Sequence, residues 1–319
     1  MSPFRVLTVG ETMALLDPAD DGPPALGTSM ALRVAGAESN YAVALRRLGV
    51  DVAWASRLGA DPLGDLVLSA LGGEGVDLRW VRRSPERPTG LYLKFREGGR
   101  TSVLYYRGGS AASELGPGDV PDEALEGIDL LHLSGITTGI AAGGTELLAG
   151  LAKRAHEAGA MVVFDPNWRP PLWEGFEAAE RAARPIYPWV DWYLCGREEG
   201  NGLFGVDGEE ALFAALEATG LPRAAVRVGA RGTLVRDAAG TIVEVPPVRL
   251  VEVVDEVGAG DGFAAGFAFG LLSGWEPERC ARAGNVVAAA ALAGTGDWET
   301  YPHLADVQDD FGITDQGGT

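Results

Sequence analysis

The chain has 319 residues, of which 46% are hydrophobic and 22% are charged, a balance typical of a globular protein and too apolar for a disordered one. Its formal net charge of −19 argues against nucleic acid or an anionic membrane surface as the main partner. The longest apolar run, residues 286–293, is far shorter than the ~20 residues that cross a bilayer. We therefore expect a cytoplasmic protein that binds small molecules.

Three residue types exclude common catalytic classes. Two cysteines, Cys195 and Cys280, give neither a disulfide framework nor zinc spacing, and the three histidines form no i, i+4 pair. The two lysines, Lys94 and Lys153, do not follow a glycine, so there is no G-x-x-x-x-G-K-[ST] phosphate loop. We expect both lysines at ordinary surface positions, which argues against a Schiff-base aldolase.

The first hundred residues predict a parallel sheet and a separate hairpin. A β-α-β unit is indicated by a strand over 4–9, a helix over 39–48 and a strand over 51–58. Residues 89–106 break this rhythm, because apolar and polar residues alternate on both sides of Gly98-Gly99. We expect this hairpin to form a flap outside the main sheet.

From residue 130 onward, strands and helices alternate again, which is typical of an α/β fold. The predicted strands cover 130–133, 161–164, 192–194, 225–228, 233–235 and 242–245, and the predicted helices cover 145–158, 209–218, 262–272 and 277–293. No internal repeat or linker interrupts this order. We predict a single α/β domain over 1–319.

A glycine-rich turn carries the strongest chemical signal. Residues 251–263 run from an extended stretch through Gly258-Ala259-Gly260 into a helix, with Asp261 directly after the turn. Small residues at a helix start leave backbone N–H groups uncovered, so that they can bind a phosphate. Beside such an anion hole, a carboxylate can take a proton from a substrate hydroxyl while the amides stabilise a transferred phosphoryl group.

Two other interpretations of this turn stay open. Residues 260–265 also fit the dinucleotide pattern G-x-G-x-x-[GA], although no third predicted strand follows them. Asp261 is also consistent with a helix N-cap of purely structural function.

Two motifs resemble those of the PfkB (ribokinase-like) carbohydrate kinases. Asp255-x-x-Gly258-Ala259-Gly260-Asp261-x-Phe263 is similar to their C-terminal signature, and Gly36-Ala37-Glu38-Ser39-Asn40 is similar to their N-terminal glycine motif. Within the family, the chain most resembles the 2-keto-3-deoxygluconate kinases, in residues 88–92, 105–113, 133–137, 165–169 and 296–299. The resemblance covers nearly the whole chain and implies a ribokinase-like three-layer α/β/α sandwich with a small β-sheet lid.

The resemblance implies ATP-dependent phosphorylation of 2-keto-3-deoxygluconate at its terminal hydroxyl. It implies Asp261 as the base and the amides of Gly258, Ala259 and Gly260 as the anion hole. Substrate contacts are implied for Gly36, Tyr92, Tyr105, Arg107, Ile136, Arg169 and Asp297. Nucleotide contacts are implied for Arg227, Gly229, Arg231 and Gly232, and Glu199 would act indirectly through a magnesium–phosphate network. The implied cofactor is Mg-ATP, with a monovalent cation as a further candidate.

The two arginines also fit a sugar acid on chemical grounds, since Arg107 and Arg169 can pair with its carboxylate against the negative field of the protein. Plainer roles exist for these residues: a solvated salt bridge for the arginines, hairpin packing for Tyr92 and Tyr105, a turn for Asp297 and an exposed helix for Glu199.

The chain departs from the family pattern at three positions. Glu256 replaces the usual threonine of the signature, Ala35 replaces a common glycine, and Gly196 replaces the asparagine of an N-x-x-E motif. These departures keep open a non-catalytic sugar- or nucleotide-binding protein. A kinase of another sugar, such as fructose or ribose, and a nicotinamide-dependent oxidoreductase also remain as alternatives.

The predicted hairpin indicates a mobile lid over the substrate site. We expect a β lid, formed by about 12–35 and 90–112, to close over the sugar and exclude water. Exposed edges of the lid strands predict a homo-oligomer, because unpaired strand edges tend to be covered.

Overall fold

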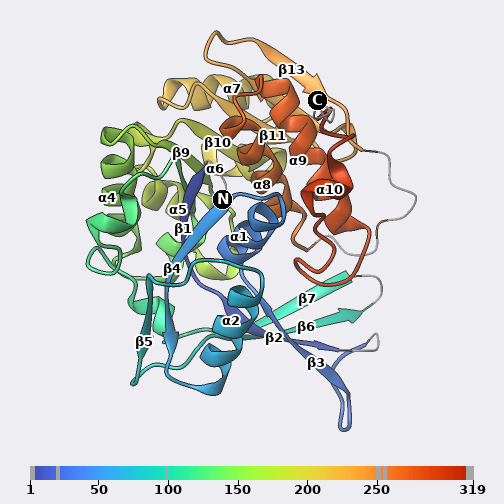
Figure 1. The fold of residues 1–319 in the computed structure, drawn as a ribbon. Coiled ribbons are helices and arrows are strands. Elements are labelled where there is room, and N and C mark those ends of the chain that lie inside the picture. Colours follow the sequence, from blue (N-terminus) through green and yellow to red (C-terminus); the bar gives the residue numbers. More distant parts are fainter. Residues whose placement is uncertain (1–3, 19–21, 98–99, 249–252, 254–256, 314–319) are drawn as a thin grey trace, which may run out of the picture.

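The computed structural model describes residues 4–18, 22–97, 100–248, 253 and 257–313. They form a three-layer α/β/α sandwich with a second, smaller sheet at one end of the molecule (Figure 1). The predicted fold class is confirmed. The predicted Gly98-Gly99 turn and the signature residues Asp255 and Glu256 lie outside the described residues.

The main sheet has nine strands in the described part of the chain, in the order β13-β12-β11-β10-β9-β8-β1-β4-β5. Their bounds are β1 (Arg5–Val9), β4 (Asp51–Gly59), β5 (Val81–Ser84), β8 (Leu130–Ser134), β9 (Met161–Asp165), β10 (Trp192–Gly196), β11 (Ala224–Arg227), β12 (Thr233–Arg236) and β13 (Ile242–Val245). Neighbours from β5 to β11 pair in parallel, whereas β12 and β13 pair antiparallel. Parallel strands end at the same edge, so the side chains that follow them gather there.

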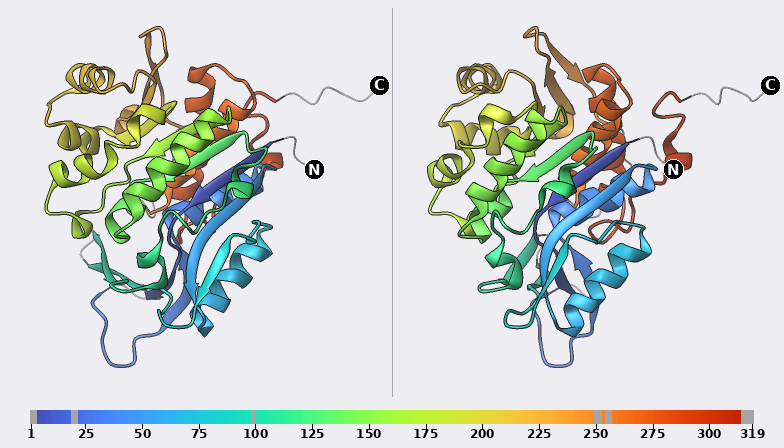
Figure 2. Two further views of the ribbon diagram at one scale, coloured as in Figure 1. Left: turned by 90° about the vertical axis from the view of Figure 1, so that its left-hand side faces the viewer. Right: turned by 60° about the vertical axis from the view of Figure 1, so that its left-hand side comes forward.

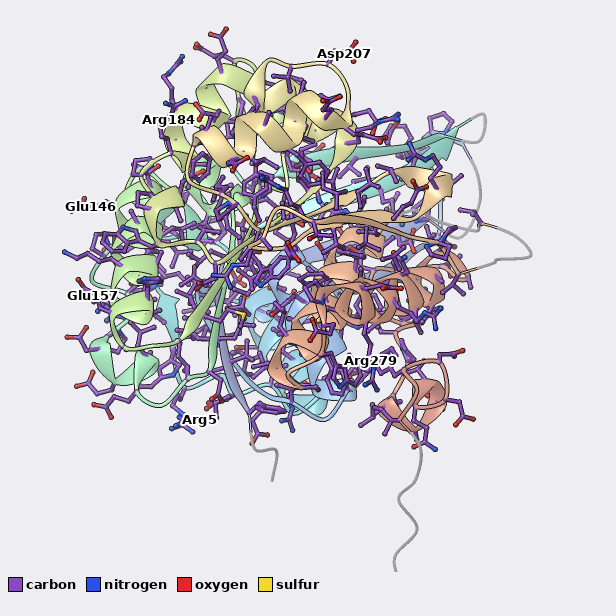
Figure 3. The ribbon with its side chains drawn as sticks, turned by 90° about the horizontal axis from the view of Figure 1, so that it is seen from above. Arg5, Glu146, Glu157, Arg184, Asp207 and Arg279 are labelled. Carbon is purple, nitrogen blue, oxygen red and sulfur yellow. The ribbon has the colours of Figure 1, made fainter. Side chains whose placement is uncertain are left out.

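Helices cover both faces of this sheet (Figure 2). One buried core contains α1 (Ala37–Arg47), α2 (Pro62–Gly73), α8 (Ala259–Leu272), α9 (Pro277–Leu292) and the short α10 (Leu304–Val307). The other contains α3 (Ile136–Ile140), α4 (Gly144–Glu157), α5 (Phe176–Ala183), α6 (Arg197–Phe204) and α7 (Glu209–Ala218). Charged side chains such as Glu146, Glu157 and Arg184 project outward from this second set (Figure 3). No helix among the described residues is both long and apolar enough to cross a membrane.

The second sheet has the order β3-β2-β6-β7, with β2 (Met13–Pro18), β3 (Met30–Ala35), β6 (Leu91–Glu97) and β7 (Arg100–Tyr106). β6 and β7 pair antiparallel, which confirms the hairpin. Tyr92 pairs with Tyr105 and Lys94 with Val103, so these four side chains share one face of the sheet. The segments predicted to form a lid contain all four strands.

Two local predictions differ from the structure. Lys94 is fully buried, so its predicted surface position is wrong, whereas Lys153 is exposed as predicted. The α8 helix begins at Ala259, three residues before the predicted start, because Gly258 takes the left-handed conformation (φ 81°) of its N-cap. No described strand follows α8, which removes the structural context of a dinucleotide-binding unit.

Candidate active site

A cavity of about 930 Å³ lies between the carboxyl edge of the main sheet and one face of the second sheet. It is lined by twelve of the predicted site residues: Gly36, Tyr92, Tyr105, Arg107, Ile136, Arg169, Glu199, Arg227, Gly258, Gly260, Asp261 and Asp297. Ala259, Gly229, Arg231 and Gly232 are not among the described residues that line it. Segments far apart in sequence therefore meet at one place.

The turn before α8 is held in a shape that only glycine fits. A Cβ atom at Gly258 would lie 2.1 Å from the carbonyl oxygen of Asp297, in addition to opposing the left-handed backbone. The hydroxyl of Tyr301 donates a hydrogen bond of 2.6 Å to the Gly258 carbonyl oxygen. No described side chain caps the first turn of α8, and both Gly258 and Gly260 line the cavity. The first N–H groups of the helix thus remain available to an anion.

Asp261 lies in this first turn and is 8% exposed. The side-chain amide of Asn40 donates to its Oδ2 over 2.8 Å, and that of Asn167 donates to its Oδ1 over 3.2 Å. Asp261 is therefore not an N-cap. Burial raises the pKa of Asp261 to about 6, while the Arg169 guanidinium and the two amides act in the opposite direction. At pH 7 the carboxylate is largely ionised and can accept a proton.

The two arginines lie in different electrostatic surroundings. Arg107 donates from Nε to Glu11 Oε2 over 2.7 Å, and Glu11 is 2% exposed. Arg169 follows β9 and lines the cavity, where its charge lowers the pKa of Asp261. Arg107 is thus paired with Glu11, whereas Arg169 forms no ion pair among the described residues and acts on Asp261 through its charge.

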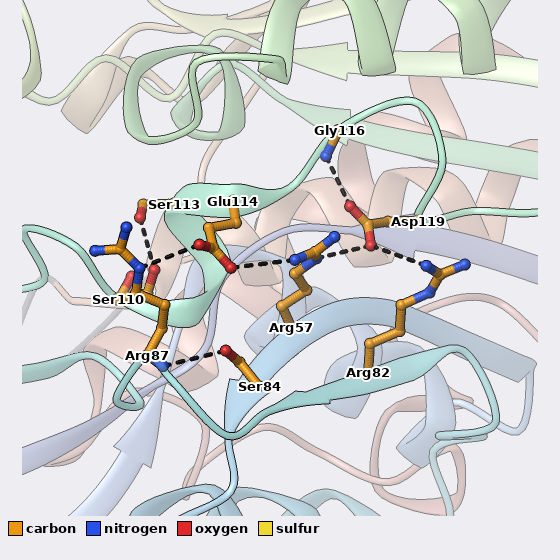
Figure 4. Close-up of polar contacts among 9 residues, drawn as sticks. All are labelled: Arg57, Arg82, Ser84, Arg87, Ser110, Ser113, Glu114, Gly116 and Asp119. Carbon is orange, nitrogen blue, oxygen red and sulfur yellow. Dashed lines mark hydrogen bonds and ion pairs between the residues drawn. The ribbon is translucent and has the colours of Figure 1, made fainter.

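The segment that follows Arg107 is fixed by a cluster of ion pairs (Figure 4). Glu114 accepts hydrogen bonds from Arg87 Nε (3.1 Å) and Arg57 Nη1 (3.2 Å), and Arg57 Nε also binds Asp119 at 2.7 Å. Ser110 lies in the same segment and donates a 2.5 Å hydrogen bond to Glu11 Oε1. The Glu11–Arg107 pair therefore has a rigid support.

The second sheet contributes Tyr92 and Lys94 to the cavity. The Tyr92 hydroxyl donates to Asp297 Oδ2 over 3.1 Å, while Asp297 Oδ1 is buried and has no hydrogen-bond partner among the described residues. Burial raises the pKa of Asp297 to about 7, and the Lys94 ammonium works against this rise. Since a buried oxygen without a partner is unfavourable, this arrangement suits a hydrogen-bond donor on a bound molecule.

The opposite end of the cavity holds Arg227, Asp165 and Glu199. Arg227 Nη1 donates to Asp165 Oδ2 over 3.1 Å, and its Nη2 lies 3.9 Å from Glu199 Oε2. Both Glu199 oxygens accept backbone N–H groups, from Trp168 (2.5 Å) and Gly196 (3.0 Å). Burial raises the pKa of Glu199. No cluster of three or more metal-ligating side chains occurs among the described residues.

Residues 228–232, directly after β11, are not among the described residues that line the cavity. Gly229 and Arg231 form a short 3₁₀ helix (Gly229–Arg231), and Gly232 follows with φ 95°. The Arg231 guanidinium is partly exposed and pairs with Glu209 and Glu244, both at 2.7 Å.

Several polar residues of the cavity were not predicted: Glu11, Glu38, Asn40, Lys94, Asp165 and Asn167. Glu11 and Asn167 follow strands, and Asp165 ends one, at the carboxyl edge of a parallel sheet, a position that could have indicated them. Glu38 and Asn40 belong to the N-terminal glycine motif itself.

Comparison with known proteins shows the family of the chain. Residues 4–304 match the family model described as pfkB family carbohydrate kinase. The chain is similar to a 2-dehydro-3-deoxygluconokinase of Bacillus subtilis (strain 168), with 33% identity over 298 residues that cover 93% of this chain and 92% of that protein. It is also similar to a 2-dehydro-3-deoxygalactonokinase of Haloferax volcanii, with 33% identity over 92% of each chain. Among solved structures, a PfkB protein from Polaromonas sp. JS666 is 34% identical, with a TM-score of 0.86 over 96% of this chain and 99% of that one.

Proposed function

The chain belongs to the pfkB family of carbohydrate kinases, and we propose that it transfers the γ-phosphoryl group of Mg-ATP to the terminal hydroxyl of 2-keto-3-deoxygluconate (2-dehydro-3-deoxygluconate), giving the 6-phosphate. The relatives from B. subtilis and H. volcanii support a sugar acid as the acceptor. One observation carries the proposal. A buried carboxylate, Asp261, is held by two amides beside the uncapped first turn of α8, in a cavity that Arg169 also lines.

Asp261 is the proposed base. The acceptor hydroxyl oxygen forms a bond to the γ-phosphorus, the bond from that phosphorus to the bridging oxygen of ADP breaks, and the hydroxyl proton passes to Asp261. The backbone N–H groups of Gly258, Ala259 and Gly260 would stabilise the charge on the transferred group. No covalent enzyme intermediate is needed.

The acceptor lies, in this proposal, between Asp261 and the second sheet. Arg169 and the remaining N–H groups of Arg107 bind its carboxylate, since a charged acid needs local cations in a protein of net charge −19. The free oxygen of Asp297 accepts a hydrogen bond from a sugar hydroxyl. Gly36, Tyr92, Tyr105 and Ile136 complete the substrate site.

The nucleotide phosphates lie, in this proposal, near Arg227, with the segment of Gly229, Arg231 and Gly232 on the nucleotide side. Both Glu199 oxygens are engaged by backbone amides, so Glu199 fits an indirect role better than direct ligation of magnesium. Mg²⁺ keeps several waters and is commonly held through substrate phosphates, which is consistent with a site of few protein ligands. The ion would neutralise charge on the β- and γ-phosphates. A monovalent cation stays a prediction, as does a cytosolic location.

The second sheet is the proposed lid and the proposed contact between subunits. Its outer face exposes Leu32 (51%), Leu104 (46%) and Tyr106 (63%), which the strand register places on one side. Such an apolar face suits a second copy of this chain. Leu104→Lys should then lower the mass measured by light scattering to that of a monomer, whereas an unchanged mass contradicts this interface.

The base is tested by Asp261→Asn, with Asp207→Asn, on an exposed loop (Figure 3), as the matched control. We expect Asp261→Asn to lower kcat by ~10²–10⁴, the usual contribution of a positioned base, and to leave sugar binding nearly intact. Asp207→Asn should behave as wild type. A kcat of Asp261→Asn within about threefold of wild type would sink the assignment.

A second acceptor is favoured by the relative from H. volcanii, which is named a 2-dehydro-3-deoxygalactonokinase. The two sugar acids differ only in the configuration of one carbon, and both offer a carboxylate and a terminal hydroxyl. Steady-state kinetics with both epimers would show which is preferred.

A further inference from the structure

Asn167 lies in a left-handed turn. Among the described residues it is the one residue other than glycine with a left-handed φ, at 43°. Asparagine tolerates this conformation better than most residues with a Cβ atom, because local hydrogen bonds can support it. The Asn167 N–H donates to Asp165 Oδ1 over 2.9 Å, which holds the turn after β9 in this shape.

The same turn is anchored at two further points. The second oxygen of Asp165 accepts a hydrogen bond of 3.1 Å from Arg227, and the N–H of Trp168 donates to Glu199. Asp165 is 3% exposed, so this anchoring takes place in a nearly dry environment. The turn therefore has little freedom, and the direction of the Asn167 side chain is fixed by it.

That side chain reaches the proposed base. Its Nδ2 donates to Asp261 Oδ1 over 3.2 Å, while Asn40 on α1 donates to Oδ2 over 2.8 Å. Each oxygen of the carboxylate thus has one amide donor, from two elements that lie 94 and 221 residues from Asp261 in sequence. Asn167 reaches its acceptor from a left-handed turn, whereas Asn40 reaches it from helix α1.

We propose that Asn167 is a positioning residue, whose side-chain amide, presented by the anchored turn after β9, orients the carboxylate of Asp261 toward the acceptor hydroxyl. The proposal rests on the proposed phosphoryl transfer. It assigns Asn167 no contact with the reacting atoms, because its effect passes through Asp261.

A hydrogen bond to the ionised form of a carboxyl lowers its pKa, so removal of the amide should raise the pKa of Asp261. The other groups that act on or respond to this carboxylate are Glu38 on α1, Asp165 and Arg169 around the end of β9, Asp297 in the loop after α9, and Tyr301. All of them remain in an Asn167 variant. The acid side of the kcat/KM profile, where Asp261 becomes protonated, should therefore move to higher pH.

Two variants separate the amide from the backbone. Asn167→Gly removes the amide and accepts the left-handed φ, whereas Asn167→Ala removes the amide and opposes that φ. We expect both to lower kcat by about 10–100-fold, as a misplaced catalytic group does, with KM for ATP and sugar within about threefold of wild type. Both should show the shifted acid limb, and only Asn167→Ala should melt at a lower temperature.

Two outcomes would overturn the proposal. If Asn167→Gly keeps kcat within about threefold of wild type while Asn167→Ala loses activity, the backbone matters and the amide does not. If both variants lose activity with an unmoved acid limb, or with a rise in KM for ATP that accounts for the loss, the amide acts on the nucleotide and not on the base.

The test also separates this proposal from the identity of the sugar. Activity of the wild type on a different sugar changes the substrate only, and the same variants are then measured on that sugar. A ¹³C-carboxyl NMR titration of Asp261 needs no turnover at all. We expect a higher pKa in Asn167→Gly than in wild type, and an unchanged pKa would contradict the role of Asn167.

Discussion

The floor of the cavity and its wall hold their polar groups in different ways. The floor, defined here as Asp261, Arg169 and the two asparagines at the carboxyl edge of the main sheet, has both oxygens of its carboxylate bonded to amides. The wall, defined as the inner face of the second sheet, bonds one oxygen of Asp297 through Tyr92 and leaves the other without a described partner. The carboxylate of the floor is thus fully hydrogen-bonded before a substrate binds, and the carboxylate bound by the wall is not.

Hydrogen bonds join the wall to the loop after α9. Tyr92 binds Asp297, and Arg33 on β3 donates a 2.6 Å hydrogen bond to Glu299, in the same loop after α9. A catalytic group gains from fixed geometry, whereas a binding surface that closes must open again for release. The fully bonded Asp261 therefore suits proton transfer, whereas the partly bonded Asp297 suits the binding of a hydrogen-bond donor.

The largest effect is expected where a buried charge loses its partner. Arg107→Met leaves Glu11, 2% exposed, without its cation and should lower the free energy of unfolding by about 3–5 kcal/mol. Urea denaturation measures this change. Glu11→Gln in the same chain should restore part of the loss, because the uncompensated charge is then gone. Equal stability of Arg107→Met and wild type would show that the pair adds nothing.

Arg169 should behave in the opposite way, because it forms no ion pair among the described residues. Arg169→Met should change the free energy of unfolding by about 1 kcal/mol or less, as expected for a half-buried side chain outside any such pair. Its KM for the sugar acid should rise by about 10–100-fold, since a charge-assisted hydrogen bond contributes about 1.5–3 kcal/mol. Unchanged KM for the acid would remove Arg169 from the carboxylate site.

A smaller effect is expected from pH on the stability of the ligand-free protein. Burial raises the pKa of Glu38 and of Asp297 to about 7 and that of Asp261 to about 6, above the values of the unfolded chain. The folded state therefore binds protons more tightly, so this part of the stability is fully present below about pH 4 and is lost as pH rises from there through 6 to 7. One pKa unit corresponds to about 1.4 kcal/mol, or roughly 2 °C in Tm for a chain of 319 residues.

Thermal melts between pH 5 and 8 measure this dependence, and Tm should fall as pH rises to about 7 and then level off. Glu38 provides the test variant, because its carboxyl group is fully buried and burial raises its pKa. Glu38→Gln should flatten the curve. A Tm that rises with pH, or a slope that Glu38→Gln leaves unchanged, would contradict the assigned protonation of this site.

The sequence predicted the elements of the fold because periodicity is a local property. The α/β alternation and the hairpin of β6 and β7 follow from patterns within about ten residues. Helix α2 was missed, although Asp61-Pro62 is a start signal and Asp61 accepts the 2.8 Å capping bond of Gly64. The Asp61-Pro62 pair is thus a local signal that is sufficient to predict the start of this helix.

The partners inside the site could not be predicted in the same way. Asn40 and Asp261 are separated by 221 residues and Arg107 and Glu11 by 96, and nothing local indicates these pairs. The limit of prediction from local sequence is clearest at Lys94. Its alternation with apolar residues on β6 was evident, but only the assembled fold shows that the polar side of the strand faces the cavity.

The central claim is most directly tested by the wild-type protein with Mg-ATP and a panel of acceptors: 2-keto-3-deoxygluconate, its galactonate epimer, fructose and ribose. The account predicts that kcat/KM for the keto-deoxy acids exceeds that for the neutral sugars by on the order of 10²-fold or more, because the arginines would be left unpaired by a neutral acceptor. An equal or higher kcat/KM for fructose or ribose, or ATP turnover without a phosphorylated sugar, would contradict it.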